Sequence, residues 1–168
     1  MMRLTRVVVA DTGPLNYLVL IGESDILPKL FEAVFVPEAV RTELRHCDAP
    51  PTVRAWAERP PAWLDIRPVP VHTDDNPTLR ALDDGERAAL VLARALSADL
   101  LLMDDRAAVA VAHAQGFAVT GTLGVLDLAA RRGLIDLGAA FTRLKATNFR
   151  CRPEIMDALL AQRPAQKT

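Results

Sequence analysis

The chain has 168 residues, of which 51% are hydrophobic and 24% charged, and its formal net charge is −1. This length favours a single domain with a sizeable core, and the composition excludes a largely disordered chain. Aromatic residues make up only 5%, which argues against stacked rings as the main device for binding single-stranded nucleic acid. Because the net charge is near zero, any basic surface for a nucleic acid must be local.

An apolar stretch near the N-terminus, residues 7–21, is interrupted by Asp11, Gly13, Pro14 and Asn16. These polar and helix-disrupting residues exclude a transmembrane span, and no segment has the pattern of a cleaved signal peptide. We therefore expect a cytoplasmic protein that does not enter a membrane.

The two cysteines, Cys47 and Cys151, stand far apart and in no paired motif. We expect both to be reduced and non-catalytic thiols. His46, Cys47 and Asp48 are consecutive and carry metal-ligating groups. Since neighbours in sequence rarely point at a common ion, we predict no zinc site there.

Short apolar runs predict the strands of a sheet that is buried on both faces. The predicted strands are residues 7–10, 34–36, 64–67, 100–103 and 118–120.

Segments with helical spacing of apolar residues lie between these runs. The predicted helices are residues 15–21, 24–31, 37–44, 53–58, 85–96, 105–115, 123–131, 136–147 and 153–160. Ser24 and Thr122 are predicted helix caps, and Asp83 with Glu86 fits a capping box. Gly116 is predicted to end the helix before it.

The alternation of strands and helices predicts an α/β fold with a parallel sheet covered on both faces. We expect one domain over residues 1–168, with a core at 7–135, C-terminal helices at 136–162 and a frayed tail at 163–168. Ligands of such sheets bind outside the carboxyl ends of the strands. The side chains at those ends are therefore the candidates for function.

Carboxylates dominate these positions. Asp11 follows the first predicted strand, Asp104 and Asp105 follow the fourth, and Glu43 and Glu86 lie on neighbouring helices. If the sheet brings them together, their mutual repulsion raises their pKa values unless a cation lies among them. Hard oxygen ligands select Mg²⁺ or Mn²⁺, and such ions activate water for attack on a phosphodiester.

Each carboxylate also has a purely structural interpretation. Asp11, and either Asp104 or Asp105, suit caps of the helices that follow them. Glu86 suits the capping box, and Glu43 suits a solvated helix face. Taken singly, caps are far commoner than metal ligands. Their joint occurrence at strand and helix ends favours a metal-dependent nuclease.

Five segments carry these residues in a fixed order: 8–15, 36–44, 82–89, 99–106 and 120–124. Together they resemble the PIN domain, the metal-dependent ribonuclease fold of VapC-like toxins from toxin–antitoxin pairs. The resemblance is greatest to a prokaryotic PIN-like subgroup. It implies a three-layer α/β/α domain with a central, mostly parallel sheet of about five strands. This sequence departs from the family pattern at Gly13, where a polar residue is usual.

The resemblance also implies an endoribonuclease that uses Mg²⁺ or Mn²⁺ and leaves a 5′-phosphate and a 3′-hydroxyl. It assigns catalysis to Asp11, Glu43, Glu86 and Asp105. It assigns metal binding to Asp11, Glu86, Asp104 and Asp105. Thr12 and Thr122 become supporting polar groups behind these carboxylates.

Three arginines near these segments, Arg41, Arg87 and Arg106, are candidate RNA contacts, although solvated helix faces explain such charges more often. The resemblance further implies a small antitoxin partner and a homodimer. Two alternatives stay open: a catalytically inactive PIN-like binding module, and a metal-dependent phosphoesterase that acts on small nucleotides.

Overall fold

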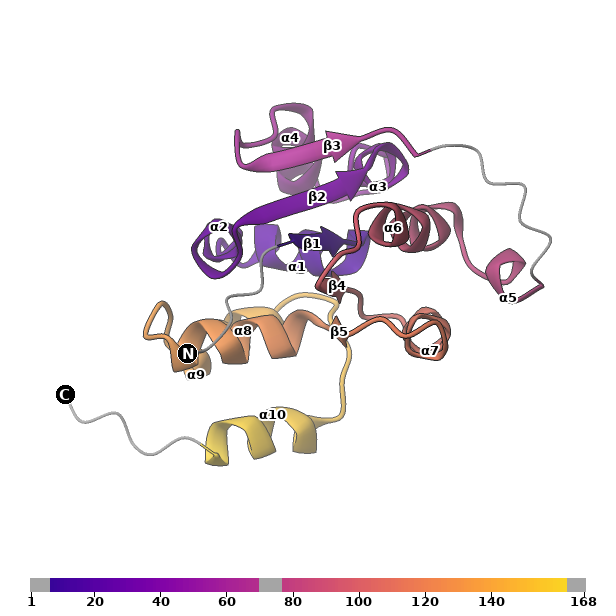
Figure 1. Ribbon diagram of the computed structural model, residues 1–168. Helices are drawn as coiled ribbons and strands as arrows, with labels where there is room; N and C mark the ends of the chain where they lie inside the picture. The colour runs from indigo at the N-terminus through magenta and orange to yellow at the C-terminus, as the bar shows by residue number, and fades with distance from the viewer. Residues whose placement is uncertain (1–6, 70–76, 163–168) are drawn as a thin grey trace.

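The computed structural model describes residues 7–69 and 77–162, and the tail expected at 163–168 lies outside this part. A five-stranded parallel sheet forms the centre, with β1, β2 and β3 side by side and pointing the same way in Figure 1. Its strands are β1 (Val7–Ala10), β2 (Ala33–Pro37), β3 (Leu64–Arg67), β4 (Leu100–Leu102) and β5 (Val119–Thr120). This confirms the predicted α/β fold.

The strand order is β3-β2-β1-β4-β5. The chain builds outward from β1 in one direction through β2 and β3, and then in the other direction through β4 and β5. The switch point therefore lies between β1 and β4, whose carboxyl ends are aligned by the pairing of Ala10 with Leu102. Asp11 continues this register, because its N–H donates to the Leu102 carbonyl at 2.9 Å.

Helices cover both faces of the sheet. The described helices are α1 (Thr12–Leu20), α2 (Ile26–Leu30), α3 (Glu38–Leu44), α4 (Pro51–Glu58), α5 (Pro77–Arg80), α6 (Asp84–Ala95), α7 (Arg106–Ala114), α8 (Thr122–Arg131), α9 (Leu137–Lys145) and α10 (Pro153–Ala161). Only α5 was not predicted, since four residues are too few for a periodic signal. None of the helices in the described part of the chain has the length and apolarity of a membrane span.

Side chains of β1 alternate between two hydrophobic clusters, as the pleat of a strand requires. Val8 and Ala10 belong to a cluster completed by α1, α8 and α9, among other elements. Val9 belongs to the opposite cluster, with residues of α6 and α7. The three layers expected from the sequence are therefore present, and both sheet faces are buried.

Most helix boundaries agree with the predicted caps. The reciprocal capping box of Asp83 and Glu86 is present at the start of α6, and Gly116 has the positive φ of 87° expected after α7. The predicted cap at Ser24 is wrong. The carbonyls of Glu23 and Ser24 accept the N–H groups of the first turn, so the backbone supplies what a capping hydroxyl would supply.

Candidate metal centre

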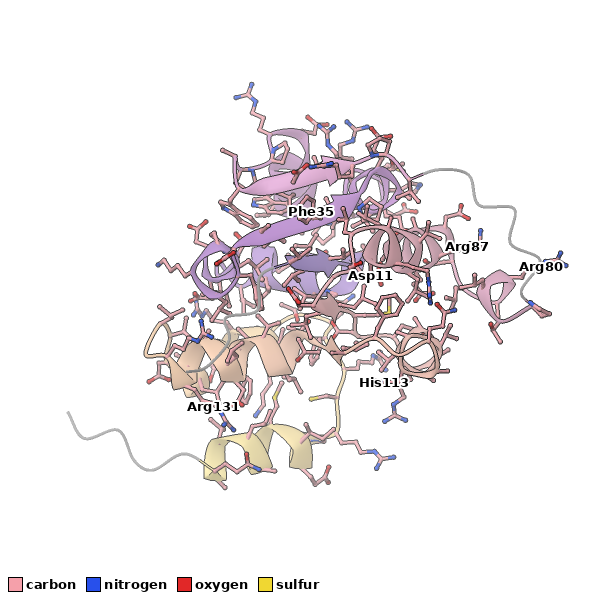
Figure 2. All side chains as sticks on the ribbon, in the orientation of Figure 1. Asp11, Phe35, Arg80, Arg87, His113 and Arg131 are labelled. Carbon is pink, nitrogen blue, oxygen red and sulfur yellow. The ribbon has the colours of Figure 1, made fainter. Side chains whose placement is uncertain are left out.

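Asp11 stands at the centre of the candidate site, at the carboxyl end of β1, and lies in the middle of the molecule in Figure 2. Only 6% of its surface is exposed, and its Oδ1 is buried without a hydrogen-bond partner in the described part of the chain. It precedes α1 but makes no side-chain cap. A buried carboxylate oxygen without a partner is costly for the fold, which suits a position that binds a cation.

Burial, together with the charges of Asp83, Glu86 and Glu43, raises the pKa of Asp11 to about 7. Burial is the largest cause, and the backbone N–H of Thr12 opposes it. A carboxylate with this pKa holds its proton until near-neutral pH, unless a positive charge compensates its own. The surroundings of Asp11 therefore disfavour its ionisation in the metal-free protein.

Glu86 lies at the start of α6 and is also largely buried. Its Oε1 accepts the Asp83 N–H at 3.1 Å, which confirms the predicted role of Glu86 in the capping box. Burial, followed by the charges of Asp83, Asp105 and Glu43, raises the pKa of Glu86, while the hydrogen bond to Asp83 lowers it. The same carboxylate thus caps a helix and belongs to the acidic group.

Glu43 links three helices. It lies on α3, and its carboxylate accepts hydrogen bonds from the Thr12 hydroxyl at the start of α1 and from the Gly85 N–H of α6, the latter at 3.1 Å. The interpretation of Glu43 as a solvated carboxylate is therefore wrong. A Cβ on Gly85 would lie 2.5 Å from Glu43 Oε1. The Glu43 carboxylate can therefore occupy its observed place only when residue 85 is glycine.

Asp104 follows β4 and is held by Thr122. Its Oδ1 accepts the Thr122 N–H at 2.7 Å, and its Oδ2 accepts the Thr122 hydroxyl at 2.6 Å. Burial raises the pKa of Asp104, and both hydrogen bonds oppose this. Thr122 is fully buried and does not cap α8, so the predicted cap is wrong because the hydroxyl supports a carboxylate instead.

Asp104 and Asp105 have different surroundings although they are adjacent. A Cβ on Gly13 would lie 3.3 Å from Asp104 Oδ2, so the absence of a side chain there leaves room for this carboxylate. Asp105 is exposed and caps α7 by accepting the Ala108 N–H at 3.0 Å. Asp105 nevertheless lies close enough to Glu86 to raise the pKa of that residue.

The carboxylates line one edge of the sheet without forming a tight cage. Within residues 7–69 and 77–162, the one group of three metal-ligating side chains whose donor atoms all lie within 4.8 Å is His46, Cys47 and Asp48. The acidic residues are more widely spaced than that. Their donors are all oxygen, and one buried oxygen lacks a partner, so the site fits a hard divalent cation that keeps part of its water shell.

Two of the three candidate RNA-contacting arginines bind the backbone. Arg41 Nε donates to the Ala57 carbonyl at 3.1 Å. Arg87 donates to the carbonyls of Leu79 and Leu82, at 3.1 and 2.8 Å. These bonds join α3 to α4, and α6 to α5 and the turn that follows it. A role of Arg41 or Arg87 in RNA binding stays a prediction.

The side chain of the third arginine, Arg106, makes no hydrogen bond or ion pair within the described part of the chain, and the same is true of the Arg152 side chain. Both line a surface cavity of about 540 Å³ between α7 and α10. Its lining residues are Arg106, Arg152, Glu154, Ile155, Ala158 and Leu159. Arg106 directly follows Asp105, so this cavity and the acidic group share the start of α7.

A family model described as a PIN domain matches residues 7–163, which is most of the chain. The chain belongs to the PIN-domain family. Comparison with curated proteins finds no match. PIN domains are in general nucleases that use divalent metal ions, and the acidic edge of this PIN domain has the donors for such an ion.

The roles of three residues, Asp83, Gly85 and Arg152, were not predictable from the sequence. Asp83 was read only as a cap, although its charge acts on both Asp11 and Glu86. Gly85 is the second residue of α6, and its close approach to the Glu43 carboxylate involves a residue 42 positions away, so no local signal indicates it. Arg152 lies far along the chain and gave no local signal.

Proposed function

We propose that this PIN domain is a Mg²⁺- or Mn²⁺-dependent endoribonuclease and the toxin of a toxin–antitoxin pair. The observation that carries the proposal is the buried Asp11 oxygen without a partner, surrounded by further carboxylates at the switch point of the sheet. A single cytoplasmic domain over residues 1–168, a small antitoxin partner and a homodimer belong to the same proposal. These last parts are supported by the resemblance to VapC-like toxins.

In this proposal, Asp11, Glu86, Asp104 and Asp105 hold the metal ion, and Glu43 completes the catalytic set. When bound, the ion supplies a nucleophilic water at neutral pH and stabilises charge on the leaving oxygen. Thr12 keeps the Glu43 carboxylate in place, and Thr122 does the same for Asp104. These supporting bonds fix the directions of carboxylates that repel one another.

The proposed reaction is tested with purified protein, single-stranded RNA and Mn²⁺. We expect cleavage that leaves 5′-phosphate ends, and we expect Asp104→Asn to reduce it at least about a hundredfold, because a metal ion contributes several kcal/mol to such reactions. Asp25→Asn, which changes an exposed carboxylate at the start of α2, is the matched control and keeps full activity. Equal cleavage by wild type and Asp104→Asn would contradict the proposal. Inhibition by mononucleotides at low concentration would favour the small-nucleotide phosphoesterase.

In the same proposal, the cavity lined by Arg106 and Arg152 binds the RNA backbone, because guanidinium groups pair with phosphate. We expect the double substitution Arg106→Ala and Arg152→Ala to weaken RNA binding about tenfold at low salt. The slope of log affinity against log salt concentration is expected to become less steep by the amount that corresponds to the loss of nearly two phosphate contacts. The measurement is RNA affinity by fluorescence anisotropy over a salt series. The control is Arg59→Ala, at the far end of α4. An unchanged salt slope would show that RNA follows another surface.

A further inference from the structure

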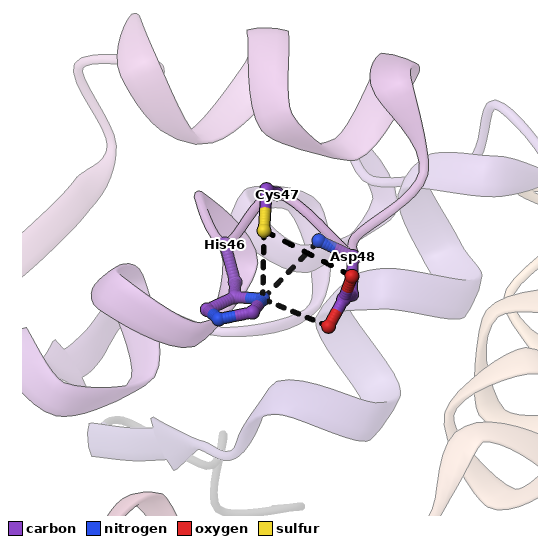
Figure 3. A group of neighbouring side chains, drawn as sticks. All are labelled: His46, Cys47 and Asp48. Carbon is purple, nitrogen blue, oxygen red and sulfur yellow. Dashed lines mark hydrogen bonds and ion pairs between the residues drawn. The ribbon is translucent and has the colours of Figure 1, made fainter.

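The loop that joins α3 to α4 brings three metal-ligating side chains together, contrary to the expectation from the sequence. His46 Nδ1 lies 3.8 Å from Cys47 Sγ and 3.5 Å from Asp48 Oδ2, and Cys47 Sγ lies 3.8 Å from Asp48 Oδ1 (Figure 3). Sequence neighbours rarely converge in this way. Here the chain turns sharply at the end of α3, where the His46 and Ala49 N–H groups bond to the Glu43 and His46 carbonyls.

These distances are close to the edges of a tetrahedron of zinc ligands. With about 2.3 Å from metal to sulfur and about 2.0–2.1 Å to nitrogen or oxygen, tetrahedral ligands lie about 3.3–3.6 Å from one another. His46 Nδ1 lies 3.8 Å from Cys47 Sγ and 3.5 Å from Asp48 Oδ2, which exceeds these values by a few tenths of an ångström. The 3.8 Å separation between Cys47 Sγ and Asp48 involves the other carboxylate oxygen, Oδ1, and with one oxygen from Asp48 the three donor atoms lie within 4.8 Å of one another. Small side-chain rotations, which exposed residues make freely, close that difference.

The donor set differs in kind from the acidic site. It combines one imidazole nitrogen, one sulfur and one carboxylate, and thiolate and imidazole ligands select Zn²⁺ and similar cations over Mg²⁺. His46 Nδ1 accepts the Asp48 N–H at 3.1 Å, so its single lone pair points at that N–H beside the other two donors. A cation between the three side chains takes over that lone pair.

The same loop forms one wall of a cavity of about 380 Å³ whose other walls include candidate site residues. The cavity is lined by Thr12, Asn16, Thr42, Glu43, Leu44, His46, Asp48, Ala49 and Pro50. His46, Cys47 and Asp48 are all exposed, so an ion held by them keeps at least one position open to the solvent. An ion on this wall lies on the same cavity as Glu43 but uses none of the carboxylates of the candidate metal centre described above.

We propose that His46, Cys47 and Asp48 form a second metal site, specific for a thiophilic divalent cation of the Zn²⁺ class, with the fourth position open. Binding forms a bond between the metal and the Cys47 sulfur, and the thiol proton passes to the solvent. The site is independent of the nuclease reaction proposed above, because its ligands are different side chains.

The test uses the full chain, stripped of metal and kept reduced, and titrated with Co²⁺. We expect the near-ultraviolet band of a cobalt–thiolate bond with the intensity of one thiolate-bound Co²⁺ per chain, and we expect Zn²⁺ to remove the band, because Zn²⁺ binds such sites more tightly. Cys47→Ser abolishes the band. His46→Gln and Asp48→Asn each weaken Zn²⁺ binding at least about tenfold, the loss expected even for groups that only support a ligand.

Two matched variants separate this site from others. Cys151→Ser removes the other free thiol, and Asp11→Asn disables the acidic site, and both keep the cobalt band if the proposal is correct. Absence of the band in the wild type overturns the proposal, as does its loss in Cys151→Ser. One Co²⁺ for two chains also overturns it, since the sulfur would then come from a contact between copies. The variants are expected to fold, because all three side chains are exposed.

Discussion

Replacement of Asp11 by asparagine is expected to abolish RNA cleavage and, at the same time, to stabilise the metal-free protein at pH 8. The substitution keeps the shape of the side chain and removes its charge. Burial has raised the pKa of Asp11 from 3.8 to about 7, so ionisation of this group above pH 7 opposes folding. Asparagine does not ionise, and it therefore escapes this cost.

The sign of the pH dependence follows from proton binding. Between pH 3.8 and about 7 the folded wild type holds a proton on Asp11 that the unfolded chain has released. The Asp11 contribution to stability therefore falls as the pH rises through this window, by at most about 1.4 kcal/mol per pH unit, and is constant above it. At pH 8 the variant is expected to be more stable than the wild type by a few kcal/mol, and near pH 4 the difference largely disappears.

Urea unfolding in the presence of a chelator, at pH 4, 6 and 8, measures this difference directly. Addition of Mn²⁺ is expected to raise wild-type stability more at pH 8 than at pH 5.5, because the cation and the proton compete for the same carboxylate. The variant gains little from Mn²⁺ at either pH. If the wild type and Asp11→Asn lose stability in parallel from pH 4 to pH 8, Asp11 is not the group that resists ionisation, and the assignment of the site to it fails.

The carboxylates at the strand ends were predictable because apolar runs in the sequence predict the strands of the sheet. Val7–Ala10 and Leu100–Leu102 are nearly pure apolar runs, since both of their faces are buried, and the first polar residue after each run marks the strand end. Asp11 and Asp104 follow directly from this rule. Glu43 and Glu86 lie on helices that the strand pattern alone does not bring to the same edge, and the family resemblance supported their place in the same site.

The directions of individual side chains were not predictable, because they depend on contacts between distant segments. The partner of Asp104 is Thr122, eighteen residues later, and nothing local distinguishes this threonine from a helix cap. Asp104 and Asp105 are adjacent and equally acidic, yet one packs beside Gly13 and the other caps α7. A sequence pattern places a residue at a strand end, whereas tertiary packing decides which way its carboxylate points.

The cluster of His46, Cys47 and Asp48 is a second case in which tertiary structure decided the directions of side chains that the sequence alone did not predict. The three residues were visible in the sequence, and the general rule that neighbours diverge argued against a site. The rule holds for regular helices and strands, where successive side chains point in different directions. It does not hold in the turn after α3, where the backbone changes direction within three residues and brings the three donors to one side.

Gly85→Ala is expected to weaken Mn²⁺ binding and RNA cleavage about ten- to a hundredfold, the range seen when a group that orients a ligand is lost, without unfolding the protein. An added Cβ would lie 2.5 and 2.7 Å from the two Glu43 carboxylate oxygens, which is closer than real contacts allow. The carboxylate is the far end of a flexible side chain, so it moves and the backbone stays. The Thr12 hydroxyl and the Gly85 N–H then lose their shared acceptor.

The substitution has two opposing effects on stability, so we expect stability to change much less than activity. Alanine is favoured over glycine inside a helix by about 0.5–1 kcal/mol, which offsets much of the lost hydrogen bonding. Gly138→Ala is the matched control, because Gly138 is likewise the second residue of its helix, and an added Cβ there meets Asp136 Oδ1 only at 3.4 Å. We expect the control to raise the thermal midpoint slightly and to leave Mn²⁺ affinity unchanged. Equal Mn²⁺ affinity in both variants would mean that the position of Glu43 does not matter for the ion, and the catalytic set would then shrink to the carboxylates around Asp11.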